Sequence, residues 1–290
     1  MANGLALRKA AREGQLSGTT TGQAPGHIQA NLIVLPAVVA RDFELLAARN
    51  PVPCPVLAKT KIPGDPHSFA PANLFLHSKD LSTVIDIRTD HPAYNVYENG
   101  KLLATKSDIK DEWTDSSVAF LIGCSFSFES ALCKAGLTPR NIDLGRNPPM
   151  FTTSSRLNPA GIFTGATMVV SMRPYRPEDI ERVREITRPY VKTHGEPVAW
   201  GWNALDELGI RDVNKPDFGP VTEFRDGEVP VFWGCGVTPQ VAVMAAAEKI
   251  PGKVMSHKPG SMLVLDITED QLFAAENTSI QPLGLVINGH

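Results

Sequence analysis

The sequence predicts an α/β protein, with a three-layer α/β sandwich as its main domain and a smaller, inserted α+β domain of two layers. Apolar runs of strand length alternate with segments of helix length along most of the chain. Two similar strand–turn–helix patterns flank a β-α-β stretch, and 290 residues suit two modest domains. We therefore expect a discontinuous main domain of residues 1–139 plus 211–290, with residues 140–210 as the insertion.

The individual elements follow from local patterns along the chain. Residues 4–13 are rich in Leu, Ala and Arg and predict a helix, and Pro36 suits the start of a second helix that runs to residue 48. Asn99-Gly100 favours the tight turn of a β-hairpin. Apolar runs predict strands at residues 30–35, 83–88, 94–97, 101–104, 118–122, 166–172, 196–200, 229–233, 253–257 and 262–267. Further helices are expected at 111–113, 127–135, 177–187, 204–208 and 239–249, loops at 50–71 and 138–165, and a turn within 269–290.

Composition and charge restrict the class of partner. The formal net charge is −3, and Lys and Arg are spread along the chain, so the basic stripe that nucleic-acid binding needs is missing. No apolar run approaches the ~20 residues that span a bilayer, and the first residues lack the apolar core of a secretory signal. We expect a protein that acts on a small molecule in the cytoplasm, with the mitochondrial matrix as the alternative and a homo-oligomer left open.

The metal-binding residue types are not arranged as a metal site. The four cysteines, Cys54, Cys124, Cys133 and Cys235, form no C-x-x-C pair, and the seven histidines form no H-x-x-x-H pair. The sequence therefore predicts no cofactor and no zinc-type centre. An oxygen-rich site for Mg²⁺ or Ca²⁺ needs no such spacing and stays open.

One pattern occurs twice, at residues 119–126 and 231–238. Each copy is an apolar strand that ends in Gly-Cys and continues through a small-residue turn into a helix. A helix N-terminus offers free N–H groups and a positive dipole end, which suit an anion and favour a thiolate. The repeat predicts catalytic thiols at Cys124 and Cys235, with Ser125, Gly236 and Thr238 in contact with the substrate; the alternative is that both thiols are core residues.

An anionic substrate also requires cations, and arginine binds a carboxylate through two parallel hydrogen bonds. Arg88, Arg146 and Arg173 lie at strand ends or beside turns, where ligands of α/β sheets usually bind. The alternative for each is a surface ion pair, for example Arg88 with Asp86 or Asp90.

Other polar residues complete the predicted site. His257 follows a strand and is suited to proton transfer near neutral pH, although a structural role explains it equally well. Residues 14–27 are rich in glycine, hydroxyls and amides and predict a loop that closes over the substrate. The expected contacts from this loop, together with the neighbour of Arg146, are Ser17, Thr19, Thr20, Thr21, Gln23 and Asn147.

Several separate stretches together resemble a known family. They are GQLSGTTTGQAPGHIQANL (14–32), DIRTD (86–90), AFLIGCSFSFE (119–129), GRNPPM (145–150), VSMRP (170–174), RDVNKPDFG (211–219), VPVFWGCGVTP (229–239) and HKPGSM (257–262). The chain resembles the bacterial and fungal family named "putative hydro-lyase", to which the D-glutamate cyclase domain of animal mitochondria also belongs. His27 departs from the pattern, because an aromatic residue such as Tyr is expected there.

The resemblance implies an α/β fold with a second, smaller α+β domain. It also implies a carbon–oxygen lyase of amino-acid metabolism that removes water from D-glutamate to give 5-oxo-D-proline. Two alternatives remain: a hydratase or dehydratase of another small carboxylic acid, and a non-catalytic protein that binds such acids.

Overall fold

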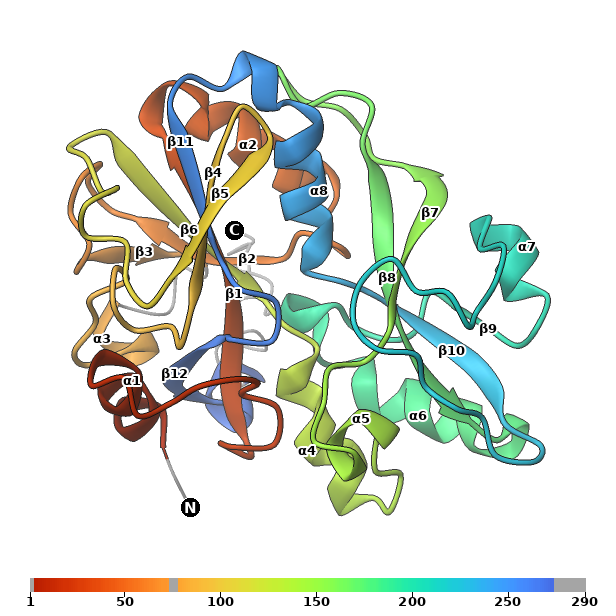
Figure 1. Ribbon diagram of the computed structural model, residues 1–290. Helices are drawn as coiled ribbons and strands as arrows, with labels where there is room; N and C mark the ends of the chain where they lie inside the picture. Colours follow the sequence, from red (N-terminus) through yellow and green to blue (C-terminus); the bar gives the residue numbers. More distant parts are fainter. Residues whose placement is uncertain (1–2, 73–77, 274–290) are drawn as a thin grey trace, which may run out of the picture.

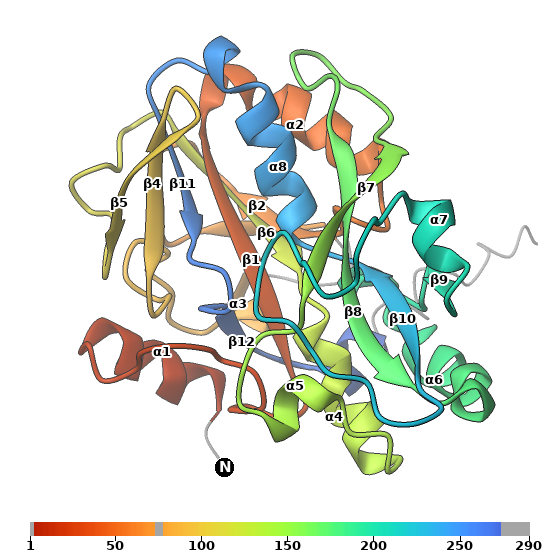
Figure 2. The same ribbon diagram turned by 45° about the vertical axis from the view of Figure 1, so that its right-hand side comes forward.

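The computed structural model describes residues 3–72 and 78–273, which contain two antiparallel sheets and eight α-helices. Figures 1 and 2 show the sheets in two halves of the molecule, with α8 near the boundary between them. The helices are α1 (Gly4–Arg12), α2 (Ala37–Arg49), α3 (Ser78–Leu81), α4 (Phe126–Lys134), α5 (Arg140–Asp143), α6 (Ile180–Thr187), α7 (Ala204–Leu208) and α8 (Val237–Ala245). The predicted α/β class is confirmed, whereas the layering as a sandwich stays a prediction.

The larger sheet has eight strands in the order β3-β2-β6-β1-β11-β4-β5, with β12 also paired to β1. Their bounds are β1 (His27–Pro36), β2 (Val56–Thr60), β3 (Phe69–Pro71), β4 (Tyr94–Glu98), β5 (Lys101–Lys106), β6 (Ser117–Gly123), β11 (Lys253–His257) and β12 (Leu263–Thr268). The central strands β1 and β6 are buried along almost their whole length, which explains their continuous apolar sequence.

The smaller sheet has the order β7-β8-β10-β9, with β7 (Met150–Arg156), β8 (Thr167–Tyr175), β9 (Ala199–Trp200) and β10 (Val229–Gly234). The second Gly-Cys strand, β10, therefore pairs with β8 of this sheet. Residues 229–234 were expected in the main domain, but they pair with a strand of the smaller sheet. The two sheets therefore do not divide the strands at the predicted boundary, residue 210. The division into folding domains itself stays a prediction.

Apolar contacts fix each helix against its sheet. Helices α2 and α8 share a buried cluster with β1 and β6 and lie side by side in both views (Figures 1 and 2). Helices α4 and α6 pack on the smaller sheet through Trp233, and α7 packs on residues of the same sheet that include Phe232. Side chains alternate between the two faces of a strand, so the adjacent residues Phe232 and Trp233 of β10 contribute to different clusters.

Several local predictions are wrong. Residues 50–71 contain β2 and β3, because the proline-free stretch Val56–Thr60 can pair with both neighbours. Residues 83–88 form no strand: the carbonyls of Ile85 and Ile87 lie within hydrogen-bonding distance of the His67 ring and the Tyr94 hydroxyl instead. Residues 138–165 contain α5 and β7, and residues 111–113 form a turn rather than a helix. The part of the tail beyond residue 273 lies outside the described residues.

Candidate active site

The two Gly-Cys units have the same strand register. In the larger sheet Ala30 of β1 pairs with Gly123 of β6, and in the smaller sheet Val170 of β8 pairs with Gly234 of β10. Each pair is antiparallel, and each glycine immediately precedes a cysteine. The resemblance between the two sequence stretches therefore extends to the strand that each one pairs with.

The backbone hydrogen bonds of the two cysteines match as well. The N–H of Cys124 donates to the carbonyl of Gln29 at 3.1 Å, and the N–H of Cys235 donates to the carbonyl of Val169 at 3.1 Å. Gln29 and Val169 occupy equivalent places, each one residue before the paired residues Ala30 and Val170. Each cysteine is thus fixed at the end of its strand in the same way.

The hydroxyls three residues after the cysteines fasten each turn to its neighbouring strand. Ser127 Oγ accepts from the N–H of Gln29 at 3.0 Å, and Thr238 Oγ1 accepts from the N–H of Val169 at 2.9 Å. Neither hydroxyl caps its helix through a side-chain bond, so the helix-capping role that their positions suggest is absent. Thr238 is fully buried and lies behind the turn, which places it outside the residues lining the pocket.

The two turns face one narrow pocket between the sheets, with a cavity volume of about 30 Å³. The pocket receives six of the predicted site residues, namely Cys124, Ser125, Asn147, Cys235, Gly236 and His257. It also receives Asn31, Ser171, Met150 and Met262, which come from β1, β8, the start of β7 and the turn before β12.

The N-termini of α4 and α8 give the pocket its donors. Among the described residues, the backbone N–H groups of Ser125 and Gly236 donate to no backbone carbonyl or side chain. A Cβ atom at Gly236 would lie 2.0 Å from the Asn31 amide nitrogen, so a larger residue here would displace the Asn31 side chain. Two helix N-termini therefore present free donors to the same small space.

Burial decides the protonation state of the thiols. Loss of solvent raises the pKa of Cys235 to about 11, although the N–H of Val237 and the charge of Arg173 favour the thiolate. The same loss raises the pKa of Cys124 well above its ordinary range, despite a hydrogen bond from the N–H of Phe126. The helix N-termini were expected to promote ionisation, but here desolvation outweighs them, and both residues are thiols at neutral pH.

Arg173 is not in the pocket lining, and four of its five N–H donors are already engaged. Its Nη2 lies 2.8 Å from Glu129 Oε1, and the two side chains are 1% and 2% exposed. Its other contacts are the hydroxyls of Ser125 and Ser171 and the rings of Phe128 and Trp233. Arg173 is therefore placed to orient residues that line the pocket, rather than to hold a carboxylate directly as predicted.

His257 is a buried, neutral ring. Its Nδ1 lies 3.1 Å from the backbone nitrogen of Leu32. A backbone N–H can only donate, so we assign Nδ1 as the acceptor and place the ring proton on Nε2. Burial lowers the pKa of His257 to about 4. The ring contacts β1 at Leu32, between the residues of β1 that pair with β12 and those that pair with β11. Because the ring is neutral, it is better suited to donate a hydrogen bond from Nε2 than to accept a proton.

The glycine-rich loop before β1 is fastened beside the pocket at several points. Thr19 Oγ1 donates to Asn147 at 3.1 Å, the backbone N–H of Thr20 donates to Gly260 at 2.8 Å, and Thr21 Oγ1 donates to Glu129 at 2.7 Å. Gln23 Nε2 turns back to the carbonyl of Thr19, and Ser17 is exposed. The loop thus supports the pocket wall through Asn147, and none of the five predicted loop residues is itself in the lining.

The other two predicted arginines lie outside the lining. Arg88 forms two hydrogen bonds with Asp86, at 2.9 and 2.8 Å, which is the ion pair considered as its alternative role. Arg146 Nη2 donates to the carbonyl of Val221 at 2.8 Å, while its neighbour Asn147 reaches the pocket.

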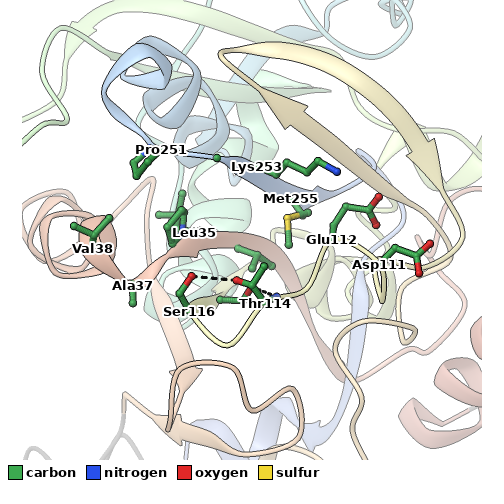
Figure 3. Close-up of a pocket in the computed structure, with 14 residues that line it drawn as sticks. Leu35, Ala37, Val38, Asp111, Glu112, Thr114, Ser116, Pro251, Lys253 and Met255 are labelled. Carbon is green, nitrogen blue, oxygen red and sulfur yellow. Dashed lines mark hydrogen bonds between the residues drawn. The ribbon is translucent and has the colours of Figure 1, made fainter.

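A larger groove, with a volume of about 600 Å³, lies at the opposite end of β1 (Figure 3). Its labelled lining includes Leu35, Ala37, Glu112, Lys253 and Met255. It holds no cysteine, histidine or arginine, so the residue types that the motifs single out are all elsewhere. The placement of the cysteines and of His257 therefore favours the smaller pocket between the sheets.

In residues 3–72 and 78–273, no group of three or more His, Cys, Asp or Glu side chains is arranged to hold a metal ion. No helix in the same ranges is both long and apolar enough to cross a bilayer.

Asn31, Ser171 and Glu129 were not predicted as site residues from the sequence. Asn31 and Ser171 lie one residue after the equivalent residues Ala30 and Val170, on the strands paired with the Gly-Cys strands. A polar residue within each apolar run, NLIVL and VVSM, is the available signal. It becomes readable only when the partner strand of each Gly-Cys unit is known.

These features define one pocket assembled from two equivalent turns, and comparisons with known proteins give the family of the chain. The model of the D-glutamate cyclase family matches residues 118–266. A protein of Schizosaccharomyces pombe named "putative hydro-lyase" is 50% identical over 91% of this chain and 84% of its own length. Equally named proteins of Bordetella petrii and Rubrobacter xylanophilus are 46% and 44% identical, over 91% and 89% of this chain and 94% and 93% of theirs. The chain belongs to the D-glutamate cyclase family.

Proposed function

We propose that the protein is a hydro-lyase that converts D-glutamate to 5-oxo-D-proline and water in the pocket between the two Gly-Cys turns. The observation that carries the proposal is the meeting of two helix N-termini, with free N–H groups at Ser125 and Gly236, in one pocket. The family membership and the names of the relatives support a lyase. The choice of D-glutamate as the substrate comes from the name of the family, and the polar groups of the site are compatible with it.

Cyclisation has a simple balance. The amino nitrogen attacks the side-chain carboxyl carbon, a nitrogen–carbon bond forms, and one carbon–oxygen bond breaks. The nitrogen of an ammonium group loses two protons, and the departing carboxylate oxygen gains two as water. The site must therefore hold the folded substrate, stabilise charge on oxygen and move protons between two nearby atoms.

The residues of the pocket suit these tasks in different ways. The free N–H groups of the two turns bind carboxylate oxygens, as helix N-termini do. The neutral ring of His257, with its proton assigned to Nε2, donates a hydrogen bond to a developing oxyanion, as a neutral imidazole can. The thiols of Cys124 and Cys235 carry protons between nitrogen and oxygen, with Cys235 nearer to ionisation because its pKa is about 11.

Incubation of the purified protein with D-glutamate, followed by chromatography and mass spectrometry, tests the proposal. We expect 5-oxoproline to form from D-glutamate much faster than from L-glutamate, and faster than in buffer. Absence of turnover on D-glutamate and related acids, combined with saturable binding of them, would instead identify a carboxylate-binding protein.

A further inference from the structure

Two hydroxyls in the pocket share one partner, the guanidinium of Arg173. Arg173 Nη2 lies 3.0 Å from Ser125 Oγ, and Nη1 lies 3.1 Å from Ser171 Oγ. Ser125 and Ser171 both line the pocket, and they are 5% and 1% exposed. The two serines come from different halves of the molecule, one from the turn after β6 and one from β8.

The chemistry of the partner sets the direction of both hydrogen bonds. A guanidinium has donors only, so each serine oxygen must accept, while each hydroxyl keeps one proton of its own. Among the described residues, neither Oγ atom has a further hydrogen-bond partner. The O–H of Ser125 and the O–H of Ser171 are therefore available to a ligand in the pocket.

Arg173 is itself held firmly in place. Its Nε and Nη2 lie 3.3 and 2.8 Å from Glu129 Oε1, and its Cζ lies 5.3 and 5.4 Å from the ring centres of Phe128 and Trp233. The hydroxyls are consequently oriented before a ligand arrives. Donors that are preorganised in this way contribute most where negative charge develops during a reaction.

We propose that Ser125 and Ser171 form a pair of hydrogen-bond donors for the substrate carboxyl group that is attacked, with Arg173 as a positioning residue that acts through them. The inference rests on the proposed function. When the amino nitrogen bonds to the carboxyl carbon, an electron pair moves onto a carboxyl oxygen, and the two O–H groups stabilise it. The electron pair then returns from this oxygen to re-form the carbonyl, and the other carboxyl oxygen leaves as water with the two protons lost by the nitrogen.

The test uses Ser125→Ala and Ser171→Ala, with Ser130→Ala as the matched control. Ser130 lies on the same helix α4, but its hydroxyl donates to Glu269 at 2.7 Å, and the residue does not line the pocket. Calorimetric titration with glutarate measures binding alone, because glutarate lacks an amine and cannot cyclise. Steady-state kinetics on D-glutamate measure kcat and KM separately.

For each pocket serine we expect glutarate affinity to fall about tenfold, as for loss of a hydrogen bond to a charged group. We expect kcat to fall about 10²- to 10³-fold, as for loss of one oxyanion donor. Ser130→Ala should stay within about twofold of the parent in both. Ser171→Thr keeps the hydroxyl and should retain most of the kcat. Arg173→Lys keeps the charge but loses the planar guanidinium that donates to both serines, so it should lower kcat.

The outcomes separate the two claims. If both pocket-serine variants bind glutarate and turn over D-glutamate as the parent does, the donor pair is wrong and the proposed function stands. If the parent lacks turnover but both variants lose glutarate binding, the donor pair stands and the proposed function is wrong. A parent protein that neither binds glutarate nor turns over D-glutamate contradicts both.

Discussion

The guanidinium of Arg173 and the carboxylate of Glu129 form an ion pair beneath the pocket, with Nη2 and Oε1 2.8 Å apart. Glu129 also accepts hydrogen bonds from Thr21 at 2.7 Å and Asn141 at 2.9 Å. One carboxylate therefore connects the glycine-rich loop, α4, α5 and β8. The position of Arg173, and through it of the two pocket serines, depends on this carboxylate.

Replacing Glu129 by Gln should destabilise the protein strongly. The change leaves the Arg173 charge buried without its counter-ion, which costs about 3–5 kcal/mol in comparable pairs. Urea unfolding measures the loss. Glu44→Gln is the matched control, because the Lys59–Glu44 pair is exposed and should contribute less than about 1 kcal/mol. Equal losses in the two variants would mean that the buried pair contributes no more than a surface pair.

The Cys235 thiol should react slowly with iodoacetamide at neutral pH. Only the thiolate reacts, and burial raises the pKa of Cys235 to about 11, so the rate should climb about tenfold per pH unit between pH 7 and 9.5. Mass spectrometry of the alkylated peptides follows each cysteine separately. A Cys235 rate that is already constant above pH 7 would show a thiolate in the resting protein.

Replacing Cys235 by Ser should lower kcat on D-glutamate by at least about 10²-fold, because a serine hydroxyl is a far weaker proton carrier. The melting temperature should stay nearly unchanged, since serine is close in size. Kinetics and a thermal melt on the same preparation distinguish the two roles of the thiol. Full activity removes Cys235 from the chemistry, and loss of the folded state identifies it as a packing residue.

Three buried histidines predict a loss of stability in mild acid. Burial lowers the pKa of His91 to about 3 and the pKa values of His194 and His257 to about 4. In the unfolded chain each ring takes up a proton below about pH 6.5. The unfolded state therefore binds more protons, and the free energy of unfolding must fall as the pH drops from about 6.5 towards 4.

Urea unfolding at a series of pH values from 7 to 4.5 checks this expectation. The slope of the free energy of unfolding against pH should approach the value for uptake of three protons on unfolding, one for each of these rings. A free energy of unfolding that stays level between pH 6.5 and 5 would show that the rings are solvated in the folded protein.

The sequence predicted the parts of the site that depend on local patterns. The two Gly-Cys turns are visible because a buried strand and the helix after it leave strong apolar signals, and both turns do line the pocket. The role of Arg173 was not visible, because its partners Glu129, Ser125 and Ser171 are between 2 and 48 residues away in the chain. The pairing of β10 with β8 was missed for the same reason, since strand pairing depends on contacts distant in sequence.

The fold shows the same limit. Ile85 and Ile87 are buried as an apolar run predicts, but side chains bond their carbonyls where a neighbouring strand was expected. Local apolarity thus identified burial correctly and the type of element wrongly. In residues 50–71 the prolines masked two strands, because they flank β2 and only Pro71 lies in a strand, as the last residue of β3.

A crystal structure of the protein with 5-oxo-D-proline tests the central claim most directly, because it locates the product without requiring turnover. We predict that the product lies between Cys124 and Cys235, with its oxygens within hydrogen-bonding distance of the turn N–H groups and of Ser125 and Ser171. Product bound instead in the groove lined by Leu35, Glu112 and Lys253 would contradict the account.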